Sequence, residues 1–483
     1  MVRSVLANFW RLGGGLSGPA IALAGAVLAG CVPAFEGIGT QDNAQIANPL
    51  AHSAILDAYG GVYRNSQLER TVERIVSRLI AASDDPTRGY AVTILNVAAV
   101  NAFALSEGYL YVTRGLITLA NDASELAAVL AHEMAHVTAD HATERRNQAL
   151  SAAIVGGAVQ DIVADPAAAQ TAVTTSQQTL ASFSRQQELE ADLVGIRTVA
   201  LAGYDPYAAA RFLTAMSRFE DYRLSIGIRQ DQRPAFLASH PASQSRINAA
   251  IAAAQAFGPP GTGDSDRENY LDSLSDVVFG DDQNQGFIRG RVFYHADLAI
   301  AFAVSQGFVL DNTQEAVLAT AADGTALRFD AVGLAPGQGL ADYLRSGWVN
   351  GLDSGSVREL TINGLAAASA SAASAGWFFR ITVIRVGSAT YRFIFANDTN
   401  TAAFDQSATR IANSFRELAS EEVANLRPLR IEIITVGSND TIAVLAARMR
   451  GVDRPEELLV ILNGIDPGAA PAPGSKIKIA TDF

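Results

Sequence analysis

Two histidines and a glutamate in one short segment are the residues of this sequence best suited to chemistry. His132 and His136 lie four positions apart, and Glu133 follows the first of them. Four helical residues turn the chain by about 400°, so both imidazoles project from one helix face. Two imidazoles in this arrangement can bind one zinc ion, and the glutamate between them lies where a general base is needed. The segment therefore predicts a metal-dependent hydrolase.

The flanking residues predict that this segment is helical. Asp122 and Glu125 form a start that is similar to a capping box. Paired surface histidines are common, so the spacing alone leaves a plain surface helix open. An apolar stripe with helical spacing instead favours a half-buried helix. Its residues are Leu126, Val129, Leu130, Met134 and Val137.

A catalytic zinc site commonly has three protein ligands, so another ligand must come from a different segment. A second predicted helix contains Glu188 and Asp192 on one face and ends at Gly203. Glu188 could bind the metal while Asp192 accepts a hydrogen bond from a ligand imidazole and fixes its tautomer. Glu190 points about 200° away around the helix and is the rival ligand. A solvated acidic face is the simpler interpretation.

At these positions the sequence resembles the BepA/HtpX-type zinc metallopeptidases of the CAAX prenyl protease superfamily, and most closely their soluble periplasmic lipoprotein branch. The similarity extends from about Leu68 to Ile247. In this family the glutamate four residues before the aspartate is the third ligand of a single zinc ion, which favours Glu188 over Glu190. The matching segments are Asn101-Ala102-Phe103, Gly108 to Leu116, the helix with His132 and His136, and Glu188 to Asp192.

The same resemblance draws attention to His240-Pro241 and Arg246. It implies either that His240 binds zinc in a resting state, or that His240 and Arg246 stabilise the oxyanion formed from a peptide carbonyl. A loop histidine at a helix start is the plainer interpretation. His141 fits a family position too, but a core or surface histidine is favoured there. His52 and His295 have no partners in the sequence.

Residues 101–105 are expected to form an edge strand, which begins with Asn101, Ala102 and Phe103. Such a strand can bind an extended substrate through main-chain hydrogen bonds. Relatives usually have Pro-Gly-Gly where this chain has Ser106-Glu107-Gly108. We expect Glu107 to alter substrate preference without removing a catalytic group.

The first thirty residues predict export from the cytoplasm. Arg3 and Arg11 precede an apolar run of small residues, which is typical of a secretory signal. The run ends in Leu28-Ala29-Gly30-Cys31, which resembles a bacterial lipobox, and Cys31 is the sole cysteine. Residues 1–30 are therefore expected to be removed and Cys31 to carry lipid. Val32 at the next position favours the periplasmic side of the outer membrane.

Composition limits the remaining possibilities. No other run approaches the roughly 18 apolar residues that span a bilayer, so an anchored soluble domain is expected. The net charge is −13 and there is no basic patch, which argues against nucleic acid as a partner. A length of 483 residues and 49% hydrophobic content favour about three domains.

Changes in composition predict the domain boundaries. A mainly α, zincin-like peptidase domain is expected over 31–257, and a Gly-Pro-rich linker over 258–283. Residues 284–421 alternate apolar and polar side chains and predict an α+β sandwich that resembles the Mog1/PsbP-type fold, with a two-residue turn at Gly387-Ser388. Its Ala-Ser-rich stretch 366–375 is predicted to be a flexible loop. The role of this domain is not readable from its residues.

Residues 429–483 resemble a LysM module with βααβ element order. The resemblance rests on a strand at 431–436, Asn439-Asp440-Thr441, Leu462-Asn463-Gly464 and the segment 473–479. Such modules commonly bind peptidoglycan. The usual Gly-Asp-Thr motif is interrupted here, because Ser438 and Asn439 follow Gly437. Glycan binding and a small packing domain therefore both stay open.

The sequence thus predicts a lipid-anchored zinc endopeptidase that degrades misfolded or misassembled envelope proteins. His132, His136 and Glu188 are the predicted ligands, and Glu133 is the predicted base. Two other classes are weighed against it. One is a peptidoglycan-binding lipoprotein with an inactive or chaperone-like peptidase domain, and the other is a hydrolase of cell-wall peptides.

Overall fold

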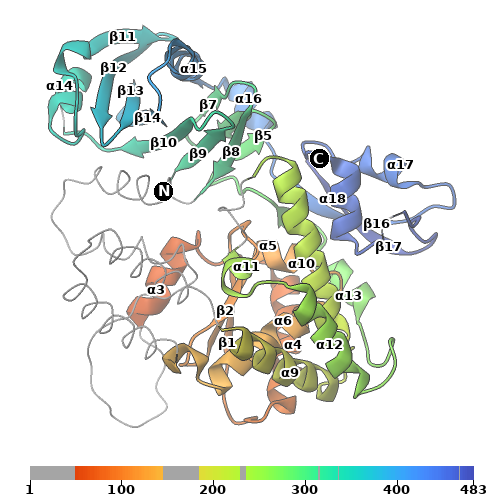
Figure 1. The fold of residues 1–483 in the computed structure, drawn as a ribbon. Coiled ribbons are helices and arrows are strands. Elements are labelled where there is room, and N and C mark those ends of the chain that lie inside the picture. Colours follow the sequence, from red (N-terminus) through yellow and green to blue (C-terminus); the bar gives the residue numbers. More distant parts are fainter. Residues whose placement is uncertain are drawn as a thin grey trace. The chain divides into compact units, whose positions relative to one another are not determined.

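The computed structural model describes residues 49–144, 184–228, 235–313, 316–335, 337–466 and 468–482. These residues form two compact units, shown in Figure 1. The larger unit contains the described residues up to 225, then 235–280 and 429–482, and the smaller contains 226–228 and 281–428. The predicted signal segment and Cys31 lie outside the described residues. No helix in the described ranges is long and apolar enough to cross a bilayer.

A buried helix, α6 (Ala123–Thr138), is the centre of the larger unit. It begins where predicted, because Asp122 Oδ1 accepts a hydrogen bond of 2.8 Å from the backbone N–H of Glu125. All its side chains from Ala123 to His136 are buried, so the helix is more enclosed than the predicted half-buried one. The surrounding helices are α3 (Pro49–Ala58), α4 (Ser66–Ala82), α5 (Arg114–Leu119), α9 (Arg185–Leu201), α10 (Ala208–Ser225), α11 (Ala235–Ser239) and α12 (Gln244–Gln255).

A three-stranded sheet lies against α6 and has the order β1-β3-β2. β1 (Ala91–Leu95) is parallel to β3 (Tyr109–Thr113), whereas β2 (Ala102–Ala104) is antiparallel to it. β2 has a single neighbour in the sheet, which confirms the predicted edge strand. An edge strand keeps one row of main-chain donors and acceptors for another chain.

Helix α9 packs closely on α6 because it carries a glycine at the contact. It ends at Leu201, and Gly203 follows with φ +81°, as predicted from the sequence. A Cβ atom at Gly195 would lie 3.1 Å from the backbone nitrogen of His132. The missing side chain lets the two helices that carry the candidate ligands approach each other.

The larger unit is discontinuous in sequence. The chain leaves it after Gly280 and returns at Leu429. At that point β4 (Val278–Phe279) pairs antiparallel with β16 (Leu429–Thr435), with Leu429 opposite Phe279. The region 258–283, predicted as a linker, instead contains α13 (Arg267–Ser273) and β4. Several of its apolar residues are buried in this unit, namely Tyr270, Leu271, Leu274, Val277 and Val278. Tyr270 is fully buried and donates to the carbonyl of Ile117 at 2.7 Å.

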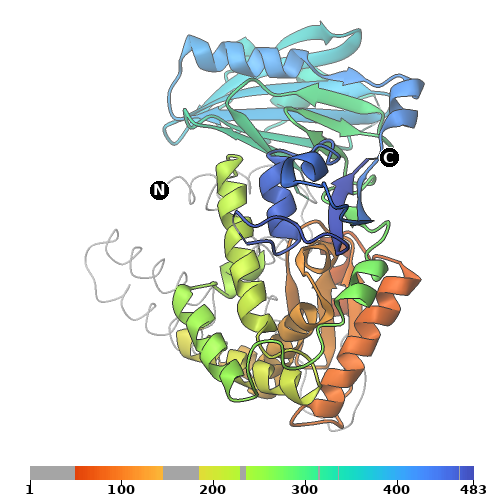
Figure 2. The ribbon, with the colours of Figure 1, turned by 90° about the vertical axis from the view of Figure 1, so that its right-hand side faces the viewer.

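The terminal module, residues 429–482, has the predicted βααβ order. β16 is followed by α17 (Ile442–Ala446), α18 (Pro455–Leu462) and β17 (Lys476–Thr481), and β17 pairs antiparallel with β16. The module belongs to the larger unit and is not a separate domain. Figures 1 and 2 both show α18 beside α10, in agreement with their contacts.

The smaller unit is built on a seven-stranded sheet of order β11-β12-β13-β14-β10-β9-β8 and a four-stranded sheet of order β15-β7-β6-β5. One apolar core joins α15 to both sheets, and another lies under α14. The elements are β5 (Phe287–Arg289), β6 (Val292–His295), β7 (Ile300–Ala303), β8 (Phe308–Asn312), β9 (Val317–Ala321), β10 (Ala326–Val332), α14 (Leu340–Arg345), η3 (Ser354–Ser356), β11 (Arg358–Ile362), β12 (Leu365–Ser374), β13 (Trp377–Val386), β14 (Ala389–Asn397), α15 (Ala402–Asn413), β15 (Arg416–Glu417) and α16 (Ser420–Asn425).

The predicted flexible loop at 366–375 is wrong, because these residues form most of β12. Ala368, Ala370 and Ala372 are buried in the core under α14. Small side chains on that face let the helix lie close to the sheet, which composition alone cannot reveal. The predicted turn at Gly387-Ser388 is confirmed, since Val386 pairs with Ala389 across it.

The Gly195 contact generates a stability prediction. A glycine-to-alanine change in an unconstrained helix stabilises by about 1 kcal/mol. For Gly195→Ala we expect the opposite, a loss of about 1–3 kcal/mol, because the new methyl group meets backbone of α6 that cannot rotate away. Urea unfolding measures this difference. The control is Gly89→Ala, whose Cβ would meet no atom within 4 Å. A more stable Gly195→Ala protein would contradict the packing described here.

Candidate metal centre

Four buried side chains from three segments converge in the larger unit. They are His132 and His136 on α6, Glu188 on α9, and His240, which follows α11. One ligand atom from each lies within 4.8 Å of the others. The structure therefore brings together the three predicted ligands and adds His240 to them.

The distances within this cluster fit a tetrahedral zinc site. His132 Nε2 lies 3.0 Å from His136 Nε2 and 3.2 Å from His240 Nδ1. Glu188 Oε1 lies 2.8 Å from His240 Nδ1 and 3.5 Å from His136 Nε2. Ligand atoms at about 2.0–2.1 Å from zinc in a tetrahedron are about 3.3 Å apart. Three imidazoles and one carboxylate are also a donor set that zinc accepts.

The electrostatics favour the metal-binding protonation states of His136 and Glu188. Burial lowers the pKa of His136 to about 2, so its imidazole is neutral. Burial alone would raise the pKa of Glu188, but His240, His136 and His132 outweigh it and hold that pKa well below its usual range. Neutral imidazole and ionised carboxylate are the forms that bind metals.

Glu133 is adjacent to the cluster without belonging to it. Its Oε1 lies 3.5 Å from His240 Nε2 and is buried without a hydrogen-bond partner among the residues that the structure describes. Burial raises the pKa of this carboxyl, an effect that His240 and His132 oppose. A carboxylate with a raised pKa is better matched to accepting and returning a proton near neutral pH.

A second layer of charges holds the candidate ligands. Asp192 Oδ1 lies 3.0 Å from His132 Nδ1, as predicted for a carboxylate that fixes the imidazole tautomer. Arg246 donates to both oxygens of Asp192, at 2.8 and 2.7 Å. Its Nη1 also lies 2.6 Å from Glu188 Oε2. Burial would raise the pKa of Asp192, but the bonds from Arg246 and His132 lower it to about 2.

The family model for Peptidase family M48 matches residues 66–254, which include all of these residues. This segment is an M48 metallopeptidase domain. The resemblance found in the sequence is thereby confirmed for this part of the chain.

Relatives support the same assignment. A protein from Vibrio cholerae serotype O1 is 32% identical over 219 residues, which cover 42% of this chain and 44% of the relative. The beta-barrel assembly-enhancing protease of Escherichia coli strain K12 is 29% identical over 189 residues, or 37% of each chain. The mitochondrial metalloendopeptidase OMA1 of Schizosaccharomyces pombe is 29% identical over 201 residues, which cover 41% of this chain and 57% of that protein. The matches thus span between 37% and 57% of the length of these relatives.

Among solved structures, the solution structure of cyanobacterial PsbP from Synechocystis sp. PCC 6803 is 11% identical. The match covers 29% of this chain and 98% of that chain, with a TM-score of 0.22. This score is too low to support an argument about the smaller unit, so the Mog1/PsbP-type resemblance stays a prediction.

Arg246 was predicted to stabilise a substrate oxyanion, but its observed contacts are with two carboxylates of the M48 domain. Its side chain is 3% exposed and faces Asp192 and Glu188. In this arrangement it organises the carboxylates behind the candidate ligands. A role toward a substrate oxyanion stays a prediction.

His141 is buried beside the cluster without being one of its four candidate ligands, in agreement with the core histidine favoured from the sequence. It is 2% exposed, and its Nδ1 lies 3.0 Å from Nδ1 of His136. Its Nε2 lies 3.6 Å from Glu190, the rival ligand, whose side chain is 55% exposed. The spacing of five residues after His136 was the available signal.

The predicted substrate strand is held firmly at its first residue. Asn101 is 3% exposed. Its backbone N–H donates to Thr113 Oγ1, and its carbonyl accepts from the backbone N–H of Thr113, both at 3.0 Å. Phe103 stacks on Tyr111 with ring centroids 4.9 Å apart. Ala102 is buried toward the core. These contacts fix the strand while its outer edge stays without a partner in the sheet.

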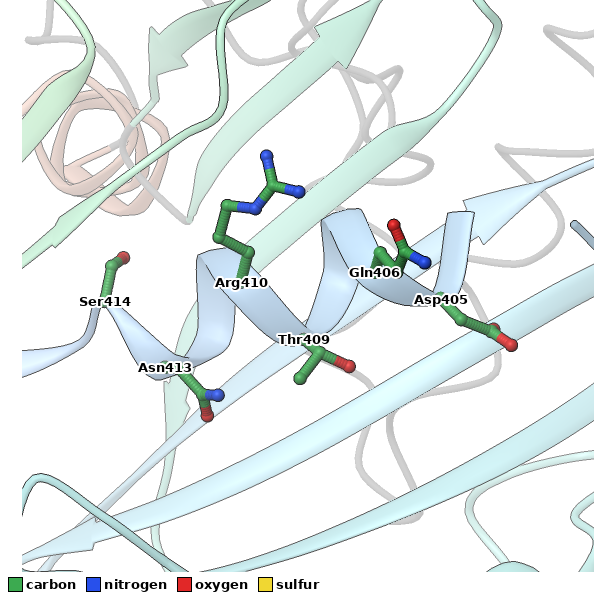
Figure 3. A pocket seen from close by; sticks show the side chains of 6 residues that line it. All are labelled: Asp405, Gln406, Thr409, Arg410, Asn413 and Ser414. Carbon is green, nitrogen blue, oxygen red and sulfur yellow. The ribbon is translucent and has the colours of Figure 1, made fainter. Parts of the chain in front are cut away.

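A shallow hollow in the smaller unit offers no comparable chemistry. Figure 3 shows its six lining residues, which all lie on or directly after α15: Asp405, Gln406, Thr409, Arg410, Asn413 and Ser414. One helix surface supplies all of them, and none is a histidine or a cysteine. His295, in the same unit, is not part of the metal cluster, and His52 contacts the Tyr111 hydroxyl at 2.7 Å.

The choice between Glu188 and Glu190 can be tested by metal content. Glu188→Gln removes a charged ligand atom, so zinc affinity should fall by more than the roughly 10- to 100-fold caused by loss of a supporting partner. Glu190→Gln should retain zinc, because its side chain is mostly exposed and outside the cluster. Zinc per chain after dialysis against a chelator measures both. Equal zinc content in the two variants would refute the assignment.

Proposed function

We propose that this chain is a zinc-dependent endopeptidase. The observation that carries the proposal is the buried cluster of three imidazoles and Glu188, with Glu133 beside it, inside an M48 domain. His132, His136 and Glu188 would hold zinc, and His240 lies where it could be a fourth ligand. Bound zinc supplies Lewis acidity, which polarises a peptide carbonyl and makes water a better nucleophile.

The protein's own groups account for the remaining steps. Glu133 accepts a proton from the attacking water and returns it to the leaving amine. Asp192 keeps His132 in one tautomer, and Arg246 keeps Asp192 and Glu188 in place. The free edge of β2 binds the substrate in extended form by main-chain hydrogen bonds.

We further propose misfolded or misassembled envelope proteins as substrates. Support comes from the name of the Escherichia coli relative, a beta-barrel assembly-enhancing protease. The sequence features at Cys31 support a lipid anchor on the periplasmic side of the outer membrane. The LysM-like pattern of the terminal module makes peptidoglycan a candidate partner as well. Cleavage of purified sacculi in place of protein would favour the cell-wall hydrolase.

Glu133→Gln separates chemistry from metal binding. The amide keeps the size of the side chain and removes the base, so we expect unchanged zinc content and a fall in kcat of roughly 10²- to 10⁴-fold. The measurement is casein cleavage by residues 32–483, with zinc content determined on the same samples. Absence of zinc from the parent protein would refute the proposal.

His240→Ala distinguishes two roles for that histidine. If His240 occupies a position that substrate or water must take, its removal should raise basal casein cleavage with zinc retained. If His240 acts on the oxyanion, cleavage should fall while zinc is retained. The control is His295→Ala, since His295 lies in the smaller unit and outside the cluster, and its loss should leave cleavage unchanged.

A further inference from the structure

The terminal module is attached to the M48 domain through β4. The sheet has the order β17-β16-β4, so a strand that follows the M48 match in sequence, after α13, is part of the sheet of the module. The backbone N–H of Ile431 donates to Val277 at 2.8 Å, and that of Asp276 donates to Ile431 at 2.9 Å. On the other side, Arg114 at the start of α5 donates to the carbonyls of Val278 and Gly280, at 2.7 and 2.9 Å.

A buried lysine makes a second connection, directly to the turn that precedes α6. Lys478 on β17 is 0% exposed. Its Nζ donates to the carbonyls of Thr118, Leu119 and Ala120, at 3.0, 3.3 and 2.6 Å. These are the last two carbonyls of α5 and the carbonyl of Ala120, which caps the helix, and none of them has a partner within the helix. An ammonium has three donors, so one side chain satisfies all three carbonyls.

The module fixes this lysine through the Asn463-Gly464 pair of its LysM-like pattern. Asn463 accepts from the backbone N–H of Lys478 at 2.7 Å and donates to the Lys478 carbonyl at 2.8 Å. Gly464 has φ +60° and lies close to the side chain of Asn121. A Cβ atom at this glycine would lie 3.3 Å from Asn121 Nδ2. The backbone of the module thus lies directly on the α5–α6 turn.

Charges around Lys478 connect it to the first turn of α6. Glu125 Oε2 accepts from the backbone N–H of Asn121 at 2.8 Å, and Arg267 donates to the Asn121 carbonyl at 2.6 Å. Asp122, the residue that begins α6, is paired with Arg211 at 3.0 Å. Burial and Arg267 hold the pKa of Lys478 below its usual range, while Glu125 and Asp122 oppose this. Removing the charge of Lys478 would leave the neighbouring carboxylates buried with less compensating positive charge.

We propose that Lys478 is a positioning residue of the peptidase, and that the terminal module completes the M48 domain by fixing the turn from which the metal-binding helix α6 begins. The inference rests on the proposed function for its catalytic consequence. The module would act through the backbone of residues 118–121, to which Lys478 is bonded.

The test compares Lys478→Met with Lys476→Met in the full chain. Both lysines lie on β17, but Lys476 is paired at the surface with Asp272 and Glu268. Lys478→Met should increase amide hydrogen exchange in residues 119–126 and lower zinc affinity. It should also lower kcat on casein by roughly 10- to 100-fold with little change in KM, because displaced catalytic groups lose rate. Lys476→Met should behave as the parent in all four measurements.

Two results would overturn the inference. One is a Lys478→Met protein that melts at a lower temperature but keeps the exchange of α6, the zinc affinity and kcat of the parent. The other is an equal loss in Lys476→Met. If Lys478→Met does not fold, Lys478→Gln, which keeps two N–H donors, is measured in its place. If the parent cleaves nothing, the proposed function fails, while hydrogen exchange and zinc affinity still decide the role of Lys478.

Discussion

The buried cluster of carboxylates and imidazoles is the constraint on which the rest of the larger unit depends. Glu133, Glu188 and Asp192 are each no more than 7% exposed, and Arg246 is the buried guanidinium that pairs with two of them. Three carboxylates opposite one guanidinium leave an excess of negative charge if the imidazoles are neutral. Burial of uncompensated charge costs several kcal/mol per ion. A divalent cation at this position would offset the excess.

This cluster explains why the surrounding helices are so closely packed. Low dielectric strengthens every charge interaction, but only if water stays out. Burial of α6 from Ala123 to His136 and the glycine contact of α9 provide that enclosure. Arg246 on α12 bonds to Asp192, and Asp192 contacts His132, so the place of α12 helps to fix the orientation of the His132 imidazole. The same enclosure requires that both ends of α6 be fixed, since a helix shift would separate the ligands.

The sequence predicted the site better than it predicted the domain organisation. The four-residue period of a helix placed His132 with His136 and Glu188 with Asp192, and these local relations survive in any fold that keeps the helices. The distance from Arg246 to Asp192, and that of His141 from His136, depend on how helices pack. Residues 366–374 belong to a strand because α14 covers their small side chains, a tertiary contact with no local signal.

The region 258–283 and the terminal module also depend on tertiary contacts that the local sequence does not reveal. Gly and Pro at 258–261 do mark the end of a helix, but they do not reveal that Tyr270 and β4 return to the core. Lys478 lies in an alternating strand, where a lysine indicates a solvent-facing position. It is buried because three carbonyls of a distant helix end require donors.

The smaller unit interrupts the larger one in the order of the chain. Residues 281–428 are inserted between β4 and β16, two strands that pair with each other. An inserted domain is tolerated where the chain enters and leaves at adjacent points, because closing the surrounding unit then requires little extra loop entropy. The M48 match ends at residue 254, yet the unit that encloses the metal cluster ends with β17. The folded unit is therefore longer than the segment that matches the family model, and its last strand supplies a lysine that donates to the carbonyls at the end of α5.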